Sequence, residues 1–143
     1  MVTPRQAYQK YGDPAIRSLE GKYMTLWTVP SDIRRGHIPS RIYCNKDMIA
    51  PLSQAFSNLI NRNHIDELKT WDGCFNVRKQ RGSISAMSLH SWGIAIDVNA
   101  ATNGLGQTPT LSPGFVKCFT DAGFDWGGNW ARKDGMHFQL SKI

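Results

Sequence analysis

A histidine and an aspartate lie seven residues apart in the segment 88–97, which reads Ser-Leu-His-Ser-Trp-Gly-Ile-Ala-Ile-Asp. Gly93 stands between His90 and Asp97 and permits a sharp turn. After this glycine, apolar residues alternate with small or polar ones, which is the period of a β-strand. We therefore expect the apolar face of this strand to pack on the core. Asp97 is then expected on the open face, where a ligand can approach.

A second segment of the same kind lies near the C-terminus. Residues 134–140 read Asp-Gly-Met-His-Phe-Gln-Leu, and apolar residues again alternate with His137 and Gln139. The pattern predicts a strand with His137 on its polar face. Two histidines and one carboxylate on strand faces are typical of a catalytic zinc site, which takes three protein ligands and keeps a fourth position open. The sequence therefore predicts one Zn²⁺ ion held by His90, Asp97 and His137.

Hydrolysis of an amide also requires a general base, which later delivers its proton to the leaving amine. Asp134 suits this role, because Gly135 permits a bend that turns the carboxylate back toward the metal. A positive group is expected near the developing oxyanion. Arg78 and Arg81 are the candidates, and we favour Arg78 because it ends a predicted strand over residues 72–78.

The remaining histidines and the tryptophans have simpler interpretations. His37 and His64 lack a histidine or carboxylate at a useful spacing, so we interpret them as ordinary surface or core residues. Tryptophans next to turn glycines are usually core or rim residues. The alternative is a platform for substrate, for which Trp92 and Trp130 are the candidates.

Periodicity and turn residues predict the elements that position these groups. In chain order we expect a short helix between Thr3 and Gly12, strands over 23–29 and 41–44, a helix over 48–62 with Pro51 in its first turn, a strand over 72–78, a polar loop over 79–87, the strand after Gly93, a loop over 100–111 near the metal, a helix from Ser112-Pro113 to Gly123, a turn or strand over 124–130, and the strand over 136–140.

Length and composition favour a single domain over residues 1–143. No apolar run approaches the roughly 20 residues of a membrane helix, and we expect no secretion signal, because residues 1–11 are polar. The net charge of +6 implies attraction to polyanions, either nucleic acid or anionic envelope material. The three cysteines are interpreted as buried apolar residues, with a Cys44–Cys74 disulfide as the alternative.

The pattern Ser88-x-His90-x-x-Gly93-x-Ala95-x-Asp97, followed by Asp-Gly-Met-His-Phe at 134–138 after a Trp-Gly-Gly-x-Trp run, resembles the M15 family of zinc peptidases. This family includes D-alanyl-D-alanine peptidases and phage endolysins that cut L-alanyl-D-glutamate bonds in peptidoglycan. The resemblance covers roughly residues 44–140. It leaves residues 1–43 as an N-terminal segment that is expected to pack on the domain.

The resemblance implies a small α+β domain with an antiparallel sheet flanked by helices, as in the hedgehog signalling domain. It also implies zinc ligation by His90, Asp97 and His137, with Asp134 as base, Ser88 as a supporting hydrogen-bonding residue, and an upstream arginine, Arg78 or Arg81, on the substrate. Two positions depart from the usual pattern. Asn129 stands where relatives often have aspartate, and Gln139 stands where they often have glutamate.

The function expected from the resemblance is that of a phage endolysin acting on peptidoglycan as an L-alanyl-D-glutamate endopeptidase. Such a protein is made in the host cytoplasm and reaches the wall after release, and we expect a monomer that neither inserts into membranes nor binds a specific nucleic acid. The alternatives are a D-alanyl-D-alanine carboxypeptidase, a zinc-containing wall-binding module without activity, a non-haem iron enzyme, which also uses two histidines and a carboxylate, and a basic nucleic-acid binder. No recognised nucleic-acid motif accompanies the charge.

Overall fold

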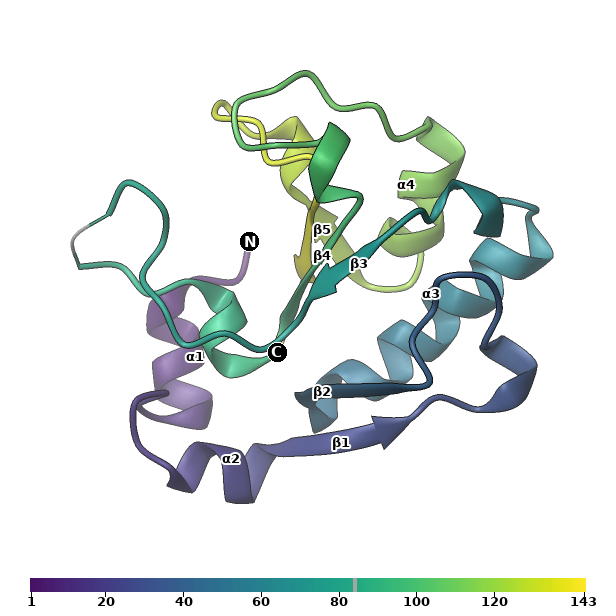
Figure 1. Cartoon of the computed structure of the whole chain (residues 1–143). Coiled ribbons are helices and arrows are strands. Elements are labelled where there is room, and N and C mark those ends of the chain that lie inside the picture. Colours follow the sequence, from purple (N-terminus) through teal and green to yellow (C-terminus); the bar gives the residue numbers. More distant parts are fainter. Residues whose placement is uncertain (84) are drawn as a thin grey trace.

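The computed structural model describes residues 1–83 and 85–143 and has a mixed α+β architecture (Figure 1). Its helices and strands follow the chain as α1 (Pro4–Tyr11), α2 (Ser18–Tyr23), β1 (Met24–Thr28), β2 (Arg41–Asn45), α3 (Ile49–Asn61), β3 (Trp71–Gly73), β4 (Ala95–Val98), α4 (Pro113–Thr120), β5 (Phe124–Trp126) and β6 (His137–Leu140). The α+β prediction is confirmed.

The strands form two antiparallel sheets rather than one. β1 and β2 make a separate two-stranded sheet, whereas the larger sheet has the order β3-β4-β6-β5. β4 and β6 are the central neighbours of the larger sheet. These are the two strands that the alternating patterns predicted around Asp97 and His137.

Helices α3 and α4 pack against each other on one side of the larger sheet (Figure 1), and α4 also packs against β5. The rings of Phe119 from α4 and Phe138 from β6 stack with centroids 4.5 Å apart. Ile96 of β4 and Phe56 of α3 are fully buried in the same core. Complete burial of these side chains fixes which face of each strand points inward, so the polar face of β4 and β6 remains open to the site.

The N-terminal helix α1 packs against a 3-10 turn at Leu89–Trp92. The indole N–H of Trp92 donates to the carbonyl of Gly12 over 2.8 Å, and its ring meets the ring of Tyr8 edge-on at 4.9 Å. Trp92 itself is fully buried. The first helix and the turn that carries His90 therefore share one packed contact.

The predicted strand over 72–78 is wrong beyond its first residues. β3 ends at Gly73, where φ is +139° and the pairing with β4 shifts register. The following residues instead bond to the turn that carries His90: Asn76 N–H donates to the His90 carbonyl, and Arg78 N–H donates to Ser91 Oγ, each over 3.1 Å. The predicted loop 79–87 includes a bridge between Lys79 and Met87, and residue 84 lies outside the described residues.

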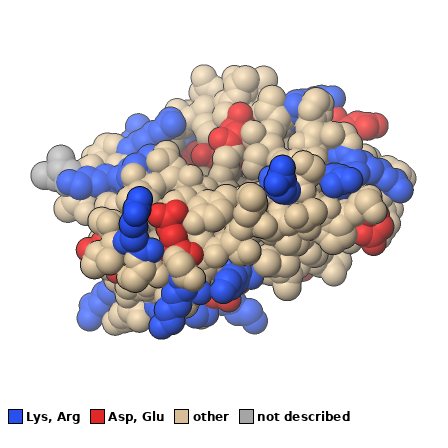
Figure 2. Space-filling model, turned by 60° about the horizontal axis from the view of Figure 1, so that its bottom comes forward, with Lys and Arg blue, Asp and Glu red and all other residues tan. Residues whose placement is uncertain are grey.

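The positive charge is distributed over the surface. Figure 2 shows lysine and arginine side chains scattered across the face that it presents, with acidic side chains between them. That face therefore carries no single basic stripe of the kind that tracks a nucleic-acid backbone. Within the part of the chain that the structure describes, no helix has both the length and the apolar character needed to cross a bilayer.

The three cysteines are free and buried, which confirms their interpretation as apolar core residues. Burial raises the pKa of the Cys44 thiol to about 12 and also raises the pKa values of Cys74 and Cys118. A thiol reacts as its thiolate, and a raised pKa lowers the fraction of thiolate at a given pH. We therefore expect all three thiols to resist an aromatic disulfide reagent at pH 8 and to react after unfolding in denaturant. Rapid reaction of one thiol in the folded protein would contradict this packing.

Gly93 is required by both its conformation and its surroundings. Its φ is +66°, and a Cβ placed there would lie 2.8 Å from the backbone nitrogen of Asn45. The left-handed conformation alone costs an alanine about 1–2 kcal/mol, and the clash adds to this. We expect Gly93→Ala to lower the free energy of unfolding by more than Gly106→Ala, measured by chemical denaturation. Gly106 also has a positive φ but has nothing within 4 Å of its would-be Cβ. Equal losses would show that the contact with Asn45 is unimportant.

Candidate active site

Asp97 and His137 are brought together by the central strand pair. They lie directly opposite each other in the register of β4 and β6. Side chains of paired residues emerge on the same sheet face, so both point away from the helices. The polar face that the sequence predicts for each residue is confirmed.

His90 reaches the site from a turn rather than from a strand, so its predicted placement on a strand face is wrong. It lies in the 3-10 turn Leu89–Trp92. Ser88 Oγ accepts the backbone N–H of His90 over 3.3 Å at the start of this turn, and Gly93 ends it in the left-handed conformation. The turn thus folds His90 back over the beginning of β4.

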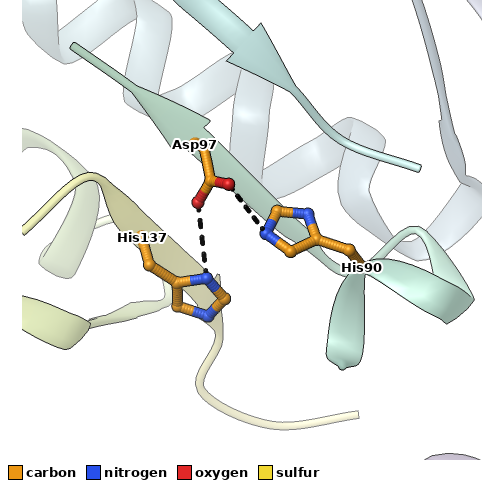
Figure 3. Close-up of side chains that lie close together, drawn as sticks. All are labelled: His90, Asp97 and His137. Carbon is orange, nitrogen blue, oxygen red and sulfur yellow. Dashed lines mark ion pairs between the residues drawn. The ribbon is translucent and has the colours of Figure 1, made fainter. Parts of the chain in front are cut away.

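The carboxylate of Asp97 lies between the two imidazoles, with one oxygen toward each ring (Figure 3). Asp97 Oδ2 is 3.2 Å from His90 Nε2, and Asp97 Oδ1 is 3.5 Å from His137 Nδ1. One ligand atom from each residue lies within 4.8 Å of the others. This buried group could therefore bind one metal ion.

Two buried atoms of this group indicate that a metal ion can bind there. Among the described residues, His90 Nε2 and Asp97 Oδ1 are buried and have no hydrogen-bond partner. Leaving buried polar atoms without partners is costly. A cation between the three side chains satisfies both atoms at once, so the residues present fit a metal ion.

The opposite ring nitrogens are held by carbonyl oxygens. His90 Nδ1 donates to the Cys74 carbonyl over 2.7 Å, and His137 Nε2 donates to Gln139 Oε1 over 3.0 Å. Each bond places the ring proton on the nitrogen facing away from the cluster. His90 Nε2 and His137 Nδ1 are then free to act as ligands. A second hydrogen bond that fixes the tautomer is the usual surrounding of a metal-ligating histidine.

The electrostatics of the cluster keep Asp97 ionised. Burial by itself raises the pKa of Asp97, but the neighbouring His137 and His90 outweigh burial and hold this pKa well below its ordinary value. Burial lowers the pKa of His137, and Asp97 more than compensates, so that pKa is raised. The carboxylate is therefore negative at neutral pH, as a metal ligand must be.

Asp134 lies beside this group without being part of it. Its Oδ2 is 4.0 Å from His137 Nδ1. Burial, partly offset by His137, raises the pKa of the Asp134 carboxyl above its ordinary value. A carboxyl with a raised pKa next to a metal site is suited to accept and return a proton.

The reason for the glycine after Asp134 differs from our expectation. Gly135 does not have a positive φ. Instead it is buried, and a Cβ there would lie 3.0 Å from both Asn103 Oδ1 and Pro109 Cβ. Both neighbours belong to the loop 100–111, which therefore lies at the site as predicted. The chain does turn here as expected, since the His137 N–H donates to the Asp134 carbonyl over 3.1 Å, but glycine is required for the close approach of this loop and not for a positive φ.

A pocket of about 390 Å³ opens onto these groups and is lined by Asp97, Asp134 and His137. Four candidates from the sequence analysis also line it: Arg78, Arg81, Ser88 and Trp130. Gln139 lines it as well, together with Arg132, which the sequence analysis did not select. Arg132 was missed because it follows a turn with no periodic pattern. The sequence offered one signal for Arg132. This residue lies four residues after a Trp-Gly-Gly run and two residues before the predicted base Asp134.

The two candidate tryptophans differ in position. Trp130 lines the pocket, and its ring centroid is 5.3 Å from that of His137. Trp92 is fully buried and packs under α1. The platform role considered for Trp92 is therefore wrong, because no substrate can reach its ring.

The other two histidines lie outside the site. His37 is exposed, whereas His64 Nδ1 lies 2.5 Å from Glu67 Oε2. The statement that His64 lacks a carboxylate partner is wrong, because a 3-10 turn at Ile65–Glu67 brings Glu67 back to it. The pair lies after the end of α3 and close to the start of α4, where a Cβ at Gly114 would clash with the His64 ring.

Ser88 supports the turn that carries His90. Ser88→Ala removes the acceptor for the His90 N–H, and a lost cap of this kind costs about 1 kcal/mol. We expect chemical denaturation to show this loss, together with weaker zinc binding because His90 is less well held. The exposed Ser40 provides the control Ser40→Ala, and equal stability of the two variants would rule out a capping role for Ser88.

Comparison with known proteins gives one match. Residues 81–140 match a family model of the M15 peptidases, which is described as D-alanyl-D-alanine carboxypeptidase. The matched range contains His90, Asp97, Asp134 and His137 but not Arg78 or α1. No curated protein and no solved structure gave a significant match.

Proposed function

We propose that this chain is a zinc-dependent peptidase that cleaves stem peptides of bacterial peptidoglycan, because residues 81–140 match a family model of the M15 peptidases. One observation carries the proposal. His90 Nε2 and Asp97 Oδ1 are buried without hydrogen-bond partners among the described residues, in a cluster that can hold a cation beside the carboxyl of Asp134. A wall-binding module without activity would not need that additional carboxyl.

We assign His90, Asp97 and His137 as the zinc ligands. These residues would hold a zinc ion, which would supply a lowered pKa of bound water and polarisation of the scissile carbonyl. Asp134 accepts the proton of the attacking water and donates it to the leaving amine, so the carboxyl ends the cycle in its starting state. Arg78 and Arg81 place positive charge in the pocket, where it stabilises the oxyanion or a substrate carboxylate.

The bond that we propose is the one between L-alanine and D-glutamate, as in a phage endolysin. Three arginines line the pocket, which exceeds the requirement of the single terminal carboxylate of a D-alanine residue. The glutamate of the stem peptide provides a carboxylate close to this scissile bond. The second candidate is a D-alanyl-D-alanine carboxypeptidase, which the description of the matching family favours.

Mass spectrometry of purified peptidoglycan digested with the zinc-loaded protein distinguishes the two activities. The endopeptidase releases peptides with a new N-terminal D-glutamate. The carboxypeptidase removes a single D-alanine from the end of the stem. Absence of any new product, with a folded protein that retains zinc, would refute the proposed function.

A further inference from the structure

The N-terminal segment lies in the same pocket as the catalytic groups. Residues 1–4 line this pocket together with Asp134 and His137. In the sequence they lie more than 80 residues before His90 and more than 90 residues before Asp97. Figure 1 shows the chain running from α1 toward the larger sheet at its N-terminal end. Val2 is only 6% exposed and belongs to the core. Residues 2–4 are therefore packed in place and form one side of the pocket, hereafter called the wall.

Two contacts hold the wall through α1. Thr3 caps the helix, with its side chain accepting the N–H of Gln6 while the Gln6 side chain accepts the N–H of Thr3. At the other end of α1, the hydroxyl of Tyr11 donates to Asp47 over 2.6 Å. Because α1 also packs on the turn that carries His90, the wall and one zinc ligand rest on a common support.

Gln139 joins the wall to a second zinc ligand. Its Oε1 accepts from His137 Nε2 over 3.0 Å, and its Nε2 donates to the Val2 carbonyl over 3.4 Å. Only 3% of Gln139 is exposed. An amide can accept at one end and donate at the other, whereas a carboxylate has no proton for the Val2 carbonyl. The amide of Gln139 can therefore bridge His137 and the N-terminal segment, which a glutamate at this position could not do.

The wall gives the pocket an apolar lining near the metal site. Val2 and Pro4 line the pocket together with Leu89, Leu105 and Met136. The arginines provide its charged lining. A surface of this kind suits a small aliphatic side chain, such as the methyl group of an alanine residue next to the scissile bond.

We propose that residues 2–4 are a specificity-determining wall that contacts the substrate, and that Gln139 is the positioning residue that locks this wall to His137. The proposal rests on the proposed peptidase function for the identity of the substrate. The bridge itself does not depend on that function, so it can be tested on the protein with or without hydrolysis.

The test compares Gln139→Glu with Gln139→Leu. Glutamate keeps the acceptor for His137 but loses the donor for Val2, so zinc affinity should stay at or above that of the unaltered protein. Leucine loses both bonds, and zinc affinity should fall by roughly 10- to 100-fold, as for other outer partners of metal-bound histidines. Both variants should show faster hydrogen exchange in the peptide covering residues 1–6, because the same bond to Val2 is lost.

Kinetics on peptidoglycan fragments separate positioning from general damage. We expect Gln139→Glu to raise KM by roughly 3- to 10-fold, the contribution of one neutral hydrogen bond, with a smaller change in kcat. Val2→Ala should also raise KM without changing zinc affinity, because the bridge uses the main-chain carbonyl. Val2→Ala also tests the wall if a Gln139 variant fails to fold, which melting curves will show. Gln9→Glu, on the exposed surface of α1, is the matched control.

The measurements distinguish failure of the bridge, failure of the substrate contact and failure of the proposed function. Unchanged exchange of residues 1–6 in Gln139→Glu would overturn the bridge. An unchanged KM in both Gln139→Glu and Val2→Ala would overturn the contact between wall and substrate. If the unaltered protein did not cleave peptidoglycan, the proposed function would fail, while the exchange and zinc measurements would still decide whether Gln139 couples residue 2 to His137.

Discussion

Replacing Asp134 by asparagine is expected to lower kcat by about 10²–10⁴-fold, the usual contribution of a general acid–base group. Asparagine preserves the shape of the side chain but cannot accept the proton of the attacking water. Zinc binding should remain, because Asp134 is not in the ligand group and lies 4.0 Å from His137 Nδ1. The measurement is single-turnover hydrolysis of peptidoglycan fragments at saturating zinc, together with the zinc content of the same preparation.

Asp32→Asn is the matched control for this change. Asp32 is exposed, in a 3-10 turn at Ser31–Ile33 away from the pocket, and its substitution should leave kcat unaltered. An Asp134→Asn protein that hydrolyses at the normal rate would disprove the assignment of the base. Loss of zinc in that variant would instead make Asp134 a ligand, which would contradict the observed arrangement.

Replacing His90 by alanine is expected to abolish both zinc binding and hydrolysis. Loss of a partner that merely orients a metal ligand costs about 10- to 100-fold in affinity, and removal of a ligand itself should cost more. Zinc that binds only the folded state stabilises it by about 2.7 kcal/mol when present at 100 times its Kd. The midpoint of thermal unfolding should therefore rise with zinc in the unaltered protein and stay constant in His90→Ala.

His37→Ala is the control for this second prediction, because His37 is exposed and far from the cluster in the sequence. That variant should keep the full zinc-dependent shift. If His90→Ala kept the shift, the metal would lie elsewhere in the protein.

The orientation of Asp97 and His137 could be predicted because it depends on local periodicity. An apolar residue at every second position commits one face of a short strand to the core, and the intervening residues must then face away. The pairing of β4 with β6 could not be predicted in this way, because an apolar face shows which side of a strand points inward but not which strand lies beside it. The loop at 100–111 and the helix starting after Ser112 were also evident from turn residues and a cap.

The position of His90 could not be predicted in the same way. Its turn depends on the approach of Asn45 to Gly93, where the Asn45 N–H donates to the Gly93 carbonyl over 3.1 Å. Asn45 is remote in the sequence, so no local pattern reveals this contact. The burial of Trp92 has the same origin, because its indole donates to a carbonyl at the end of α1. Long-range packing overrides the local signal at both positions.

The contribution of the N-terminal segment was hidden for a related reason. Its first residues carry no periodic pattern, and the polar character of Gln139 gives no indication of which backbone group it meets. Only the folded arrangement brings Val2 and His137 to opposite ends of one amide. Arg132 likewise enters the pocket through the course of the chain between β5 and β6.

The proposed function requires that one metal ion at His90, Asp97 and His137 is needed for cleavage of peptidoglycan. The most direct test follows release of new amino groups from purified peptidoglycan by the protein as prepared, after removal of metal with a chelator, and after return of zinc. We predict that hydrolysis disappears on chelation and returns as zinc reaches one ion per chain. Full hydrolysis by protein shown to contain no metal would contradict the claim.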